Sequence, residues 1–233
     1  MLTLGIDGCR AGWLYVARNM EKGDCRAGIL TRIDGLLDLV PVPAAVAIDI
    51  PIGLMDSGPR LCDLEARKVL GRPRSSSVFP APVRRILGAA TYAEACAVGR
   101  AADGRAINRE TWNIIPKIRE VDGFLRAHPE YRRMVHETHP ELCFWRWNGG
   151  KGMNHAKKTP QGRAEREALV VSVFGAEVEA ARASLPRAGW ASDDLLDAFA
   201  TLWTATRILA GTHVTLPARP PVDRRGLQME IVS

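Results

Sequence analysis

The chain has 233 residues and a formal net charge of +6 at pH 7. That length suffices for one sizeable α/β domain with a packed core and room for an insertion. Five cysteines are scattered along the chain without a C-x-x-C pair, and they are Cys9, Cys25, Cys62, Cys96 and Cys143. This spacing argues against a disulfide framework and against a zinc site.

The N-terminal region has no pattern typical of export or membrane insertion. Asp7 and Arg10 interrupt the first ten residues, and the longest apolar run, 39–48, contains Pro41 and Pro43. We therefore expect no signal peptide, no membrane span and a cytoplasmic location.

Three short apolar or alternating runs, 2–7, 13–18 and 25–31, are separated by glycine-containing turns and predict a β-meander. A short helical stretch, 33–39, then leads to the almost wholly apolar run 44–50. A crossover before such a strand predicts that it lies parallel to a neighbour and is buried on both faces.

The rest of the chain alternates between helices and one more strand. An Arg- and Pro-rich insertion is expected at about 55–112. A helix at 113–128, a strand at 133–137 and a charged helix at 162–182 follow it. The last helix is predicted to begin with Ser192 as its cap and to stop at Gly211. Together these elements predict a single α/β domain, 1–233. Its mixed sheet has five strands in the order 3-2-1-4-5 and is flanked by helices.

Two of the predicted strands end in a carboxylate. Strand side chains alternate, so Asp7 shares a face with Gly5, and Asp49 shares a face with Ala47. If the two strands are parallel neighbours, both acids converge on a face that small residues keep open.

The last helix carries two more acids. Asp194 and Asp197 are three residues apart and so lie one above the other, beside an apolar stripe that includes Leu196, Phe199 and Trp203. That stripe would dock the helix on the sheet. Small residues beneath would allow a close approach.

Clustered carboxylates need compensation, because two charges about 4 Å apart repel by roughly 4 kcal/mol at an effective dielectric constant near 20. A shared proton could supply it, as in a carboxylate dyad. Hard divalent cations are the commoner solution. A pair of Mg²⁺ or Mn²⁺ ions can activate a water and stabilise the leaving oxygen of a phosphodiester.

Motifs along the whole chain resemble a known family. "GIDGC", "AIDIPIG" and "DDLLDAFA" are similar to segments of the ribonuclease H-like superfamily. Together with "RPRSSSVFPAPVR", "IIPKIREVD" and "ETHPE", they resemble the domain-of-unknown-function family 429, whose members are predicted nucleases of that fold. The resemblance implies two-metal phosphodiester hydrolysis, with Asp7, Asp49 and Asp194 or Asp197 as metal ligands. It implies no particular substrate.

Several of these residues also have a simpler interpretation. Asp7 beside a glycine could cap a turn, and Asp193 is an ordinary acid at a helix start. Glu137 ends a predicted strand and could be a further catalytic ligand. His136 and His139 flank it at alternating spacing and are more typical of structural or surface positions.

The sequence contains no convincing Ser or Cys nucleophile, which suits metal-dependent hydrolysis. Arg and Lys residues in the insertion and between Lys151 and Arg166 could hold the backbone of DNA or RNA. Two alternatives stay open: a phosphohydrolase acting on a small metabolite, and a non-enzymatic nucleic-acid-binding module. Actin-like kinases also begin with a G-I-D strand, but this chain is too short for their duplicated domains.

Overall fold

The computed structural model describes all residues, 1–233, as two compact units. The first unit comprises 1–49, 133–214 and 232–233, and the second comprises 50–132 and 215–231. The insertion predicted at about 55–112 lies within the second unit.

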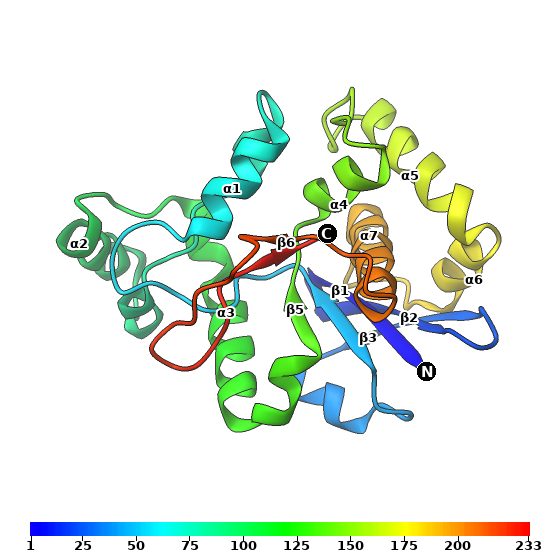
Figure 1. Ribbon diagram of the computed structural model, residues 1–233, viewed down its shortest axis with the longest axis horizontal. Coiled ribbons are helices and arrows are strands. Elements are labelled where there is room, and N and C mark those ends of the chain that lie inside the picture. The colour runs from blue at the N-terminus through cyan, green and yellow to red at the C-terminus, as the bar shows by residue number, and fades with distance from the viewer. The chain divides into compact units, whose positions relative to one another are not determined.

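The first unit is built around a five-stranded mixed sheet (Figure 1). Its strands are β1 Leu2–Cys9, β2 Gly12–Asn19, β3 Cys25–Leu30, β4 Ala45–Ile48 and β5 Val135–Glu137. The spatial order is β3-β2-β1-β4-β5, with β1 antiparallel to β2 and parallel to β4. This confirms the predicted mixed sheet and its ribonuclease H-like strand order.

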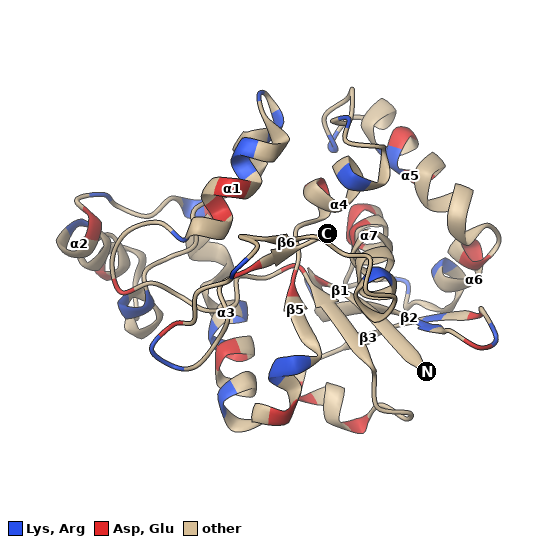
Figure 2. Ribbon diagram, in the orientation of Figure 1, with Lys and Arg blue, Asp and Glu red and all other residues tan.

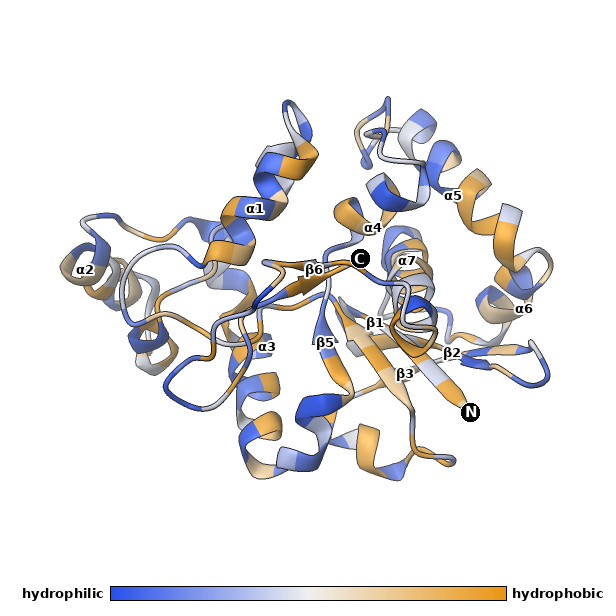
Figure 3. Ribbon diagram, in the orientation of Figure 1, coloured by the Kyte–Doolittle hydropathy of each residue, from blue (hydrophilic) through white to orange (hydrophobic).

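The apolar composition of β1 and β4 explains why they lie at the centre of the sheet. Figure 3 colours the ribbon by the hydropathy of each residue. Leu4 and Ile6 of β1 are fully buried, and so are Val46, Ala47 and Ile48 of β4. A strand buried on both faces favours such a continuous apolar run. The prediction for β4 is confirmed.

The first unit also contains five helices. They are the 3₁₀ helix η1 Ile33–Asp38 and the α-helices α4 Pro140–Trp147, α5 Pro160–Phe174, α6 Glu177–Ser184 and α7 Ser192–Leu209. The prediction of one helix over 162–182 is wrong, because Gly175 ends α5 with a φ of +54°. Glycine adopts this left-handed conformation without the cost that a Cβ imposes.

Helix α7 lies directly against the sheet, packing on β1, β2 and β4. At Gly5 an added Cβ would stand 2.0 Å from the backbone nitrogen of Leu202 and 2.2 Å from the carbonyl oxygen of Ala198. The chain therefore needs a residue without a side chain at the crossing point. This confirms that small residues allow the last helix a close approach.

The second unit is mainly helical. Its elements are α1 Leu61–Leu70, η2 Arg74–Ser77, η3 Arg84–Gly88, α2 Tyr92–Asp103, α3 Arg109–Ala127 and η4 Pro129–Arg133 at its boundary. Helix α3 begins earlier than predicted because Asn108 caps it, accepting a hydrogen bond from the Thr111 N–H at 2.7 Å.

Two short strands, β6 Thr215–Leu216 and β7 Ile231–Val232, pair in a separate two-stranded sheet. Among all the helices, none combines the length and the hydrophobicity that crossing a bilayer requires.

Candidate functional site

The two strand acids stand side by side. Asp7 lies in β1, and Asp49 directly follows β4, one residue beyond the paired Ile6 and Ile48. The backbone N–H of Asp49 donates to the carbonyl of Ile6 at 3.0 Å, which extends this register. Both side chains therefore point to the face of Gly5, which α7 covers. The structure brings the two acids together as predicted.

Helix α7 adds two acids that differ in their roles. Asp197 is buried in the second turn, with 4% of its surface exposed. Asp194 accepts a hydrogen bond from the backbone N–H of Ala191 at 2.8 Å and so helps to cap the helix. Ser192 is the first helical residue and not the cap that the sequence predicted.

The four acids are close enough to affect one another. Burial raises the pKa of Asp7 well above its usual value, and the charges of Asp49, Asp197 and Asp194 raise it further. Burial, opposed by His139, raises the pKa of Asp49 to about 6, with Asp197 adding to the rise. Burial is also the main reason why the pKa of Asp197 is raised. The site thus holds more negative charge than its surroundings compensate.

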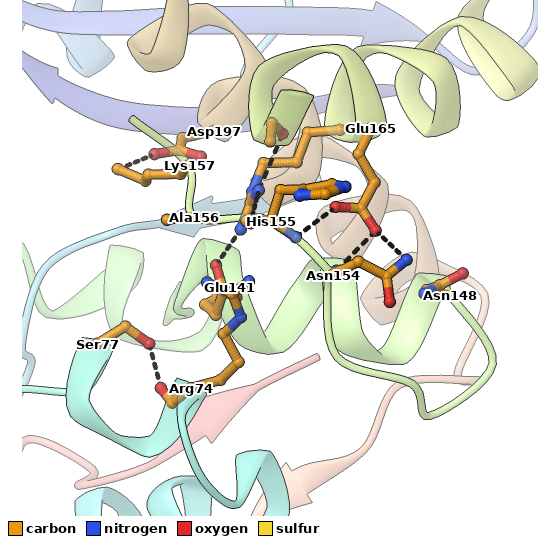
Figure 4. Close-up of polar contacts among 12 residues, drawn as sticks. Arg74, Ser77, Glu141, Asn148, Asn154, His155, Ala156, Lys157, Glu165 and Asp197 are labelled. Atoms are coloured by element: carbon orange, nitrogen blue, oxygen red, sulfur yellow. Dashed lines mark hydrogen bonds and ion pairs between the residues drawn. The ribbon is translucent and has the colours of Figure 1, made fainter. Parts of the chain in front are cut away.

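Lys157 supplies part of the compensation (Figure 4). It lies in the loop between α4 and α5, and its Nζ is 2.8 Å from Oδ2 of Asp197. The charge of Asp197 raises the pKa of Lys157, with smaller contributions from Asp7 and Asp49. Sequence reasoning placed Lys157 in a basic segment for nucleic acid and did not foresee its place among the aspartates.

The sequence favoured a structural or surface position for His139. Its Nδ1 accepts a hydrogen bond from the Glu141 N–H at 3.2 Å at the start of α4, and its charge opposes the rise in the pKa of Asp49. A histidine directly before Pro140 is a possible helix cap in the sequence, but nothing in the sequence indicates its proximity to Asp49.

The structure does not bring Glu137 to the aspartates. Glu137 pairs with Ile48 in the parallel ladder of β4 and β5, so it points to the face opposite Asp49. It is buried there, at 4% exposure. Period-two alternation thus separates Glu137 from the other predicted catalytic residues.

The donor chemistry of the site fits a hard divalent cation, since Asp7, Asp49 and Asp197 offer carboxylate oxygens on one face. The side chains are not arranged as a finished metal site: no group of three or more His, Cys, Asp or Glu is placed to hold an ion. A carboxylate oxygen of Asp197 is instead engaged by Lys157. An ion that used Asp197 would have to share that residue with the lysine.

The fold and the site define an α/β protein with a mixed sheet in the ribonuclease H-like order and a cluster of aspartates, of which Asp7 and Asp197 are buried. The family model described as "Protein of unknown function (DUF429)" matches residues 5–222, and the chain belongs to this family. The matched range contains all four aspartates. No curated protein and no solved structure matches the chain.

Proposed function

We propose that this chain is a divalent-metal-dependent nuclease of the ribonuclease H-like class. The observation that carries the proposal is the convergence of Asp7, Asp49 and Asp197 on one face of the sheet, each with a raised pKa. An enzyme keeps such an uncompensated cluster when a cation is to be bound there. The strand order supports the same class.

In this proposal Asp7, Asp49 and Asp194 or Asp197 hold the metal. When bound, Mg²⁺ or Mn²⁺ ions supply the charge that activates a water and that neutralises the leaving oxygen, the two roles of a two-metal site. The oxygen of the water bonds to phosphorus, and the bond from phosphorus to the 3′ oxygen breaks. The products are a 5′-phosphate and a 3′-hydroxyl, with one proton released to solvent.

Basic residues along the loop between α4 and α5 and at the start of α5 suit a phosphate backbone (Figure 2). Lys151, Lys158 and Arg163 are exposed in the first unit, in the loop before α5 and in its first turn. Contacts of this kind position a nucleic acid without reading its sequence, and they weaken steeply with salt. DNA and RNA are equally compatible with these contacts. We propose a cytoplasmic location, because thiols stay reduced in the cytosol and the five cysteines of the chain are free.

A cleavage assay tests the proposal. Single-stranded, duplex, hybrid and branched DNA and RNA are incubated with Mg²⁺ or Mn²⁺ and with wild type, Asp49→Asn or Asp197→Asn. Cleavage should fall by more than about 100-fold in both variants, since even partners behind metal ligands are worth about 10–100-fold. The exposed Asp38→Asn is the matched control, with activity expected to equal that of wild type.

The variants also separate the alternatives. Undiminished cleavage by Asp49→Asn and Asp197→Asn would place the activity elsewhere. Binding without cleavage by wild type would favour a nucleic-acid-binding module. If wild type neither binds nor cuts any substrate, a phosphohydrolase for a small metabolite becomes the better hypothesis.

A further inference from the structure

The loop that carries Lys157, residues 148–159, is fixed by α5 (Figure 4). The carboxylate of Glu165 accepts hydrogen bonds from the backbone N–H of Asn154 at 2.7 Å, its side-chain amide at 2.9 Å and the N–H of His155 at 3.0 Å. Two of these three bonds hold the backbone itself, at the residues two and three positions before Lys157.

A buried arginine holds the same loop from beneath. Arg166 donates to the carbonyl of His155 at 3.3 Å and pairs with Glu141 at 2.7 Å, and both of these charged side chains are more than nine-tenths buried. Gly162 lets the loop approach closely, because an added Cβ would lie 2.0 Å from the carbonyl oxygen of Ala156.

The chain is fixed on the other side of Lys157 as well. The Thr159 hydroxyl donates to the carbonyl of Ala156 at 2.8 Å, and its oxygen accepts from the Gly162 N–H at 3.1 Å as the cap of α5. The backbone of Lys157 is therefore held from both directions. Its ammonium reaches a carboxylate that is only 5% exposed, although 42% of the lysine side chain faces solvent.

We propose that the ammonium of Lys157 takes the place of one of the two cations in two-metal hydrolysis. The site then takes up a single divalent ion. The inference rests on the proposed function. The ion binds Asp7 and Asp49, while Asp197 holds the ammonium. A second cation at Asp197 would be repelled by a lysine that the fixed loop keeps in place.

The ammonium can also act on the substrate. It has three N–H donors, and Asp197 takes one of them. The other two can donate to a phosphate oxygen or to the leaving oxygen as charge develops there. Lys157 thus becomes a catalytic residue as soon as a phosphodiester is bound.

Calorimetric titration of the purified protein with Mn²⁺, without substrate, measures the number of ions directly. Wild type should bind one ion, and Lys157→Met should bind two. Lys157→Arg keeps the charge and should bind one. Lys158→Met is the matched control, since it removes the neighbouring exposed lysine, and it should also bind one.

The outcomes distinguish this inference from the proposed function. Two ions in wild type, or one in Lys157→Met, would overturn the inference and leave metal-dependent hydrolysis standing. No Mn²⁺ binding by wild type would overturn both. Lys157→Gln serves as a second neutral variant, with the thermal unfolding transition showing that each protein is folded.

Discussion

Each unit of the molecule buries a group of charged side chains, and the two groups are balanced differently. In the second unit Asp223 accepts hydrogen bonds from the backbone N–H groups of Leu54, Arg225 and Leu227 and pairs with Arg84. Burial raises the pKa of Asp223, but these donors outweigh it and leave the pKa below its usual value. This carboxylate is stable as an anion.

The aspartates of the first unit have fewer such donors: Asp197 accepts from Lys157, and Asp194 accepts from the backbone N–H of Ala191. Asp7, Asp49 and Asp197 are held together by the sheet and α7, and all three have raised pKa values. The difference between the units is therefore the number of donors and not the number of acids. A balanced carboxylate stabilises the fold, whereas an unbalanced one costs stability and attracts a cation.

Removing the balanced acid should have the largest effect. Asp223→Ala leaves Arg84 with Asp122 as its one remaining carboxylate partner. It also leaves three backbone N–H groups without their acceptor. Losing one partner of a buried pair costs about 3–5 kcal/mol. Urea unfolding should show this loss in the free energy of unfolding. A change below about 1 kcal/mol would contradict the assignment of Asp223 to a structural role.

The second prediction concerns the glycine that brings the helix acids to the strand acids. In Gly5→Ala the new Cβ meets backbone atoms of Ala198 and Leu202, so α7 must move away from β1. Overpacking of this kind costs about 1–3 kcal/mol. Urea unfolding measures this loss. An unchanged free energy of unfolding would show that α7 shifts without cost.

Neutralising an aspartate of the first unit should raise stability, whereas removing Asp223 lowers it. Asp49→Asn removes a charge that the fold opposes, so at pH 7.5 the metal-free variant should be more stable than wild type. The gain should be about 1–2 kcal/mol, allowing for partial exposure to water. Thermal unfolding in the presence of a chelator measures it. A less stable Asn variant would mean that the Asp49 carboxylate is already balanced.

The same residue predicts a pH dependence. Because the pKa of Asp49 is raised in the folded state to about 6, the folded protein binds a proton at Asp49 more tightly than the unfolded chain does. The stability that this proton contributes is complete below the usual pKa of 3.8 and is lost as pH rises through about 6. The difference in unfolding free energy between Asp49→Asn and metal-free wild type should therefore grow between pH 4 and about 7. A constant difference over this range would contradict the raised pKa.

The strand acids could be predicted because their positions depend on short-range regularities. Alternation along β1 and β4, together with the crossover between them, was enough to place Asp7 beside Asp49. The same rule places Glu137 on the opposite face once the register with Ile48 is known, but the sequence does not give that register. A shift of one residue reverses the face of every side chain in a strand.

Lys157 could not be predicted because a loop has no periodicity. Its position follows from Glu165 and Arg166, whose contacts with the loop span ten or eleven residues, and from Asp197, forty residues away. Its type and charge were visible in the sequence, but its partner was not. The functional site is thus predictable where it rests on the sheet and unpredictable where a loop completes it.

The smallest predicted effect tests whether the loop is fixed as the contacts indicate. Glu165→Ala removes three hydrogen bonds from the loop, but they lie near the surface, where water replaces them. The free energy of unfolding should fall by only about 1 kcal/mol. The local effect should be larger: amide hydrogens of Asn154 and His155 should exchange at least about tenfold faster, since about 1.4 kcal/mol of lost protection is a factor of ten.

Glu167→Ala is the matched control, because Glu167 lies on the same helix and pairs with Arg182 instead of the loop. If both variants protect the two amides equally, Glu165 does not hold the loop, and Lys157 reaches Asp197 by its own attraction alone.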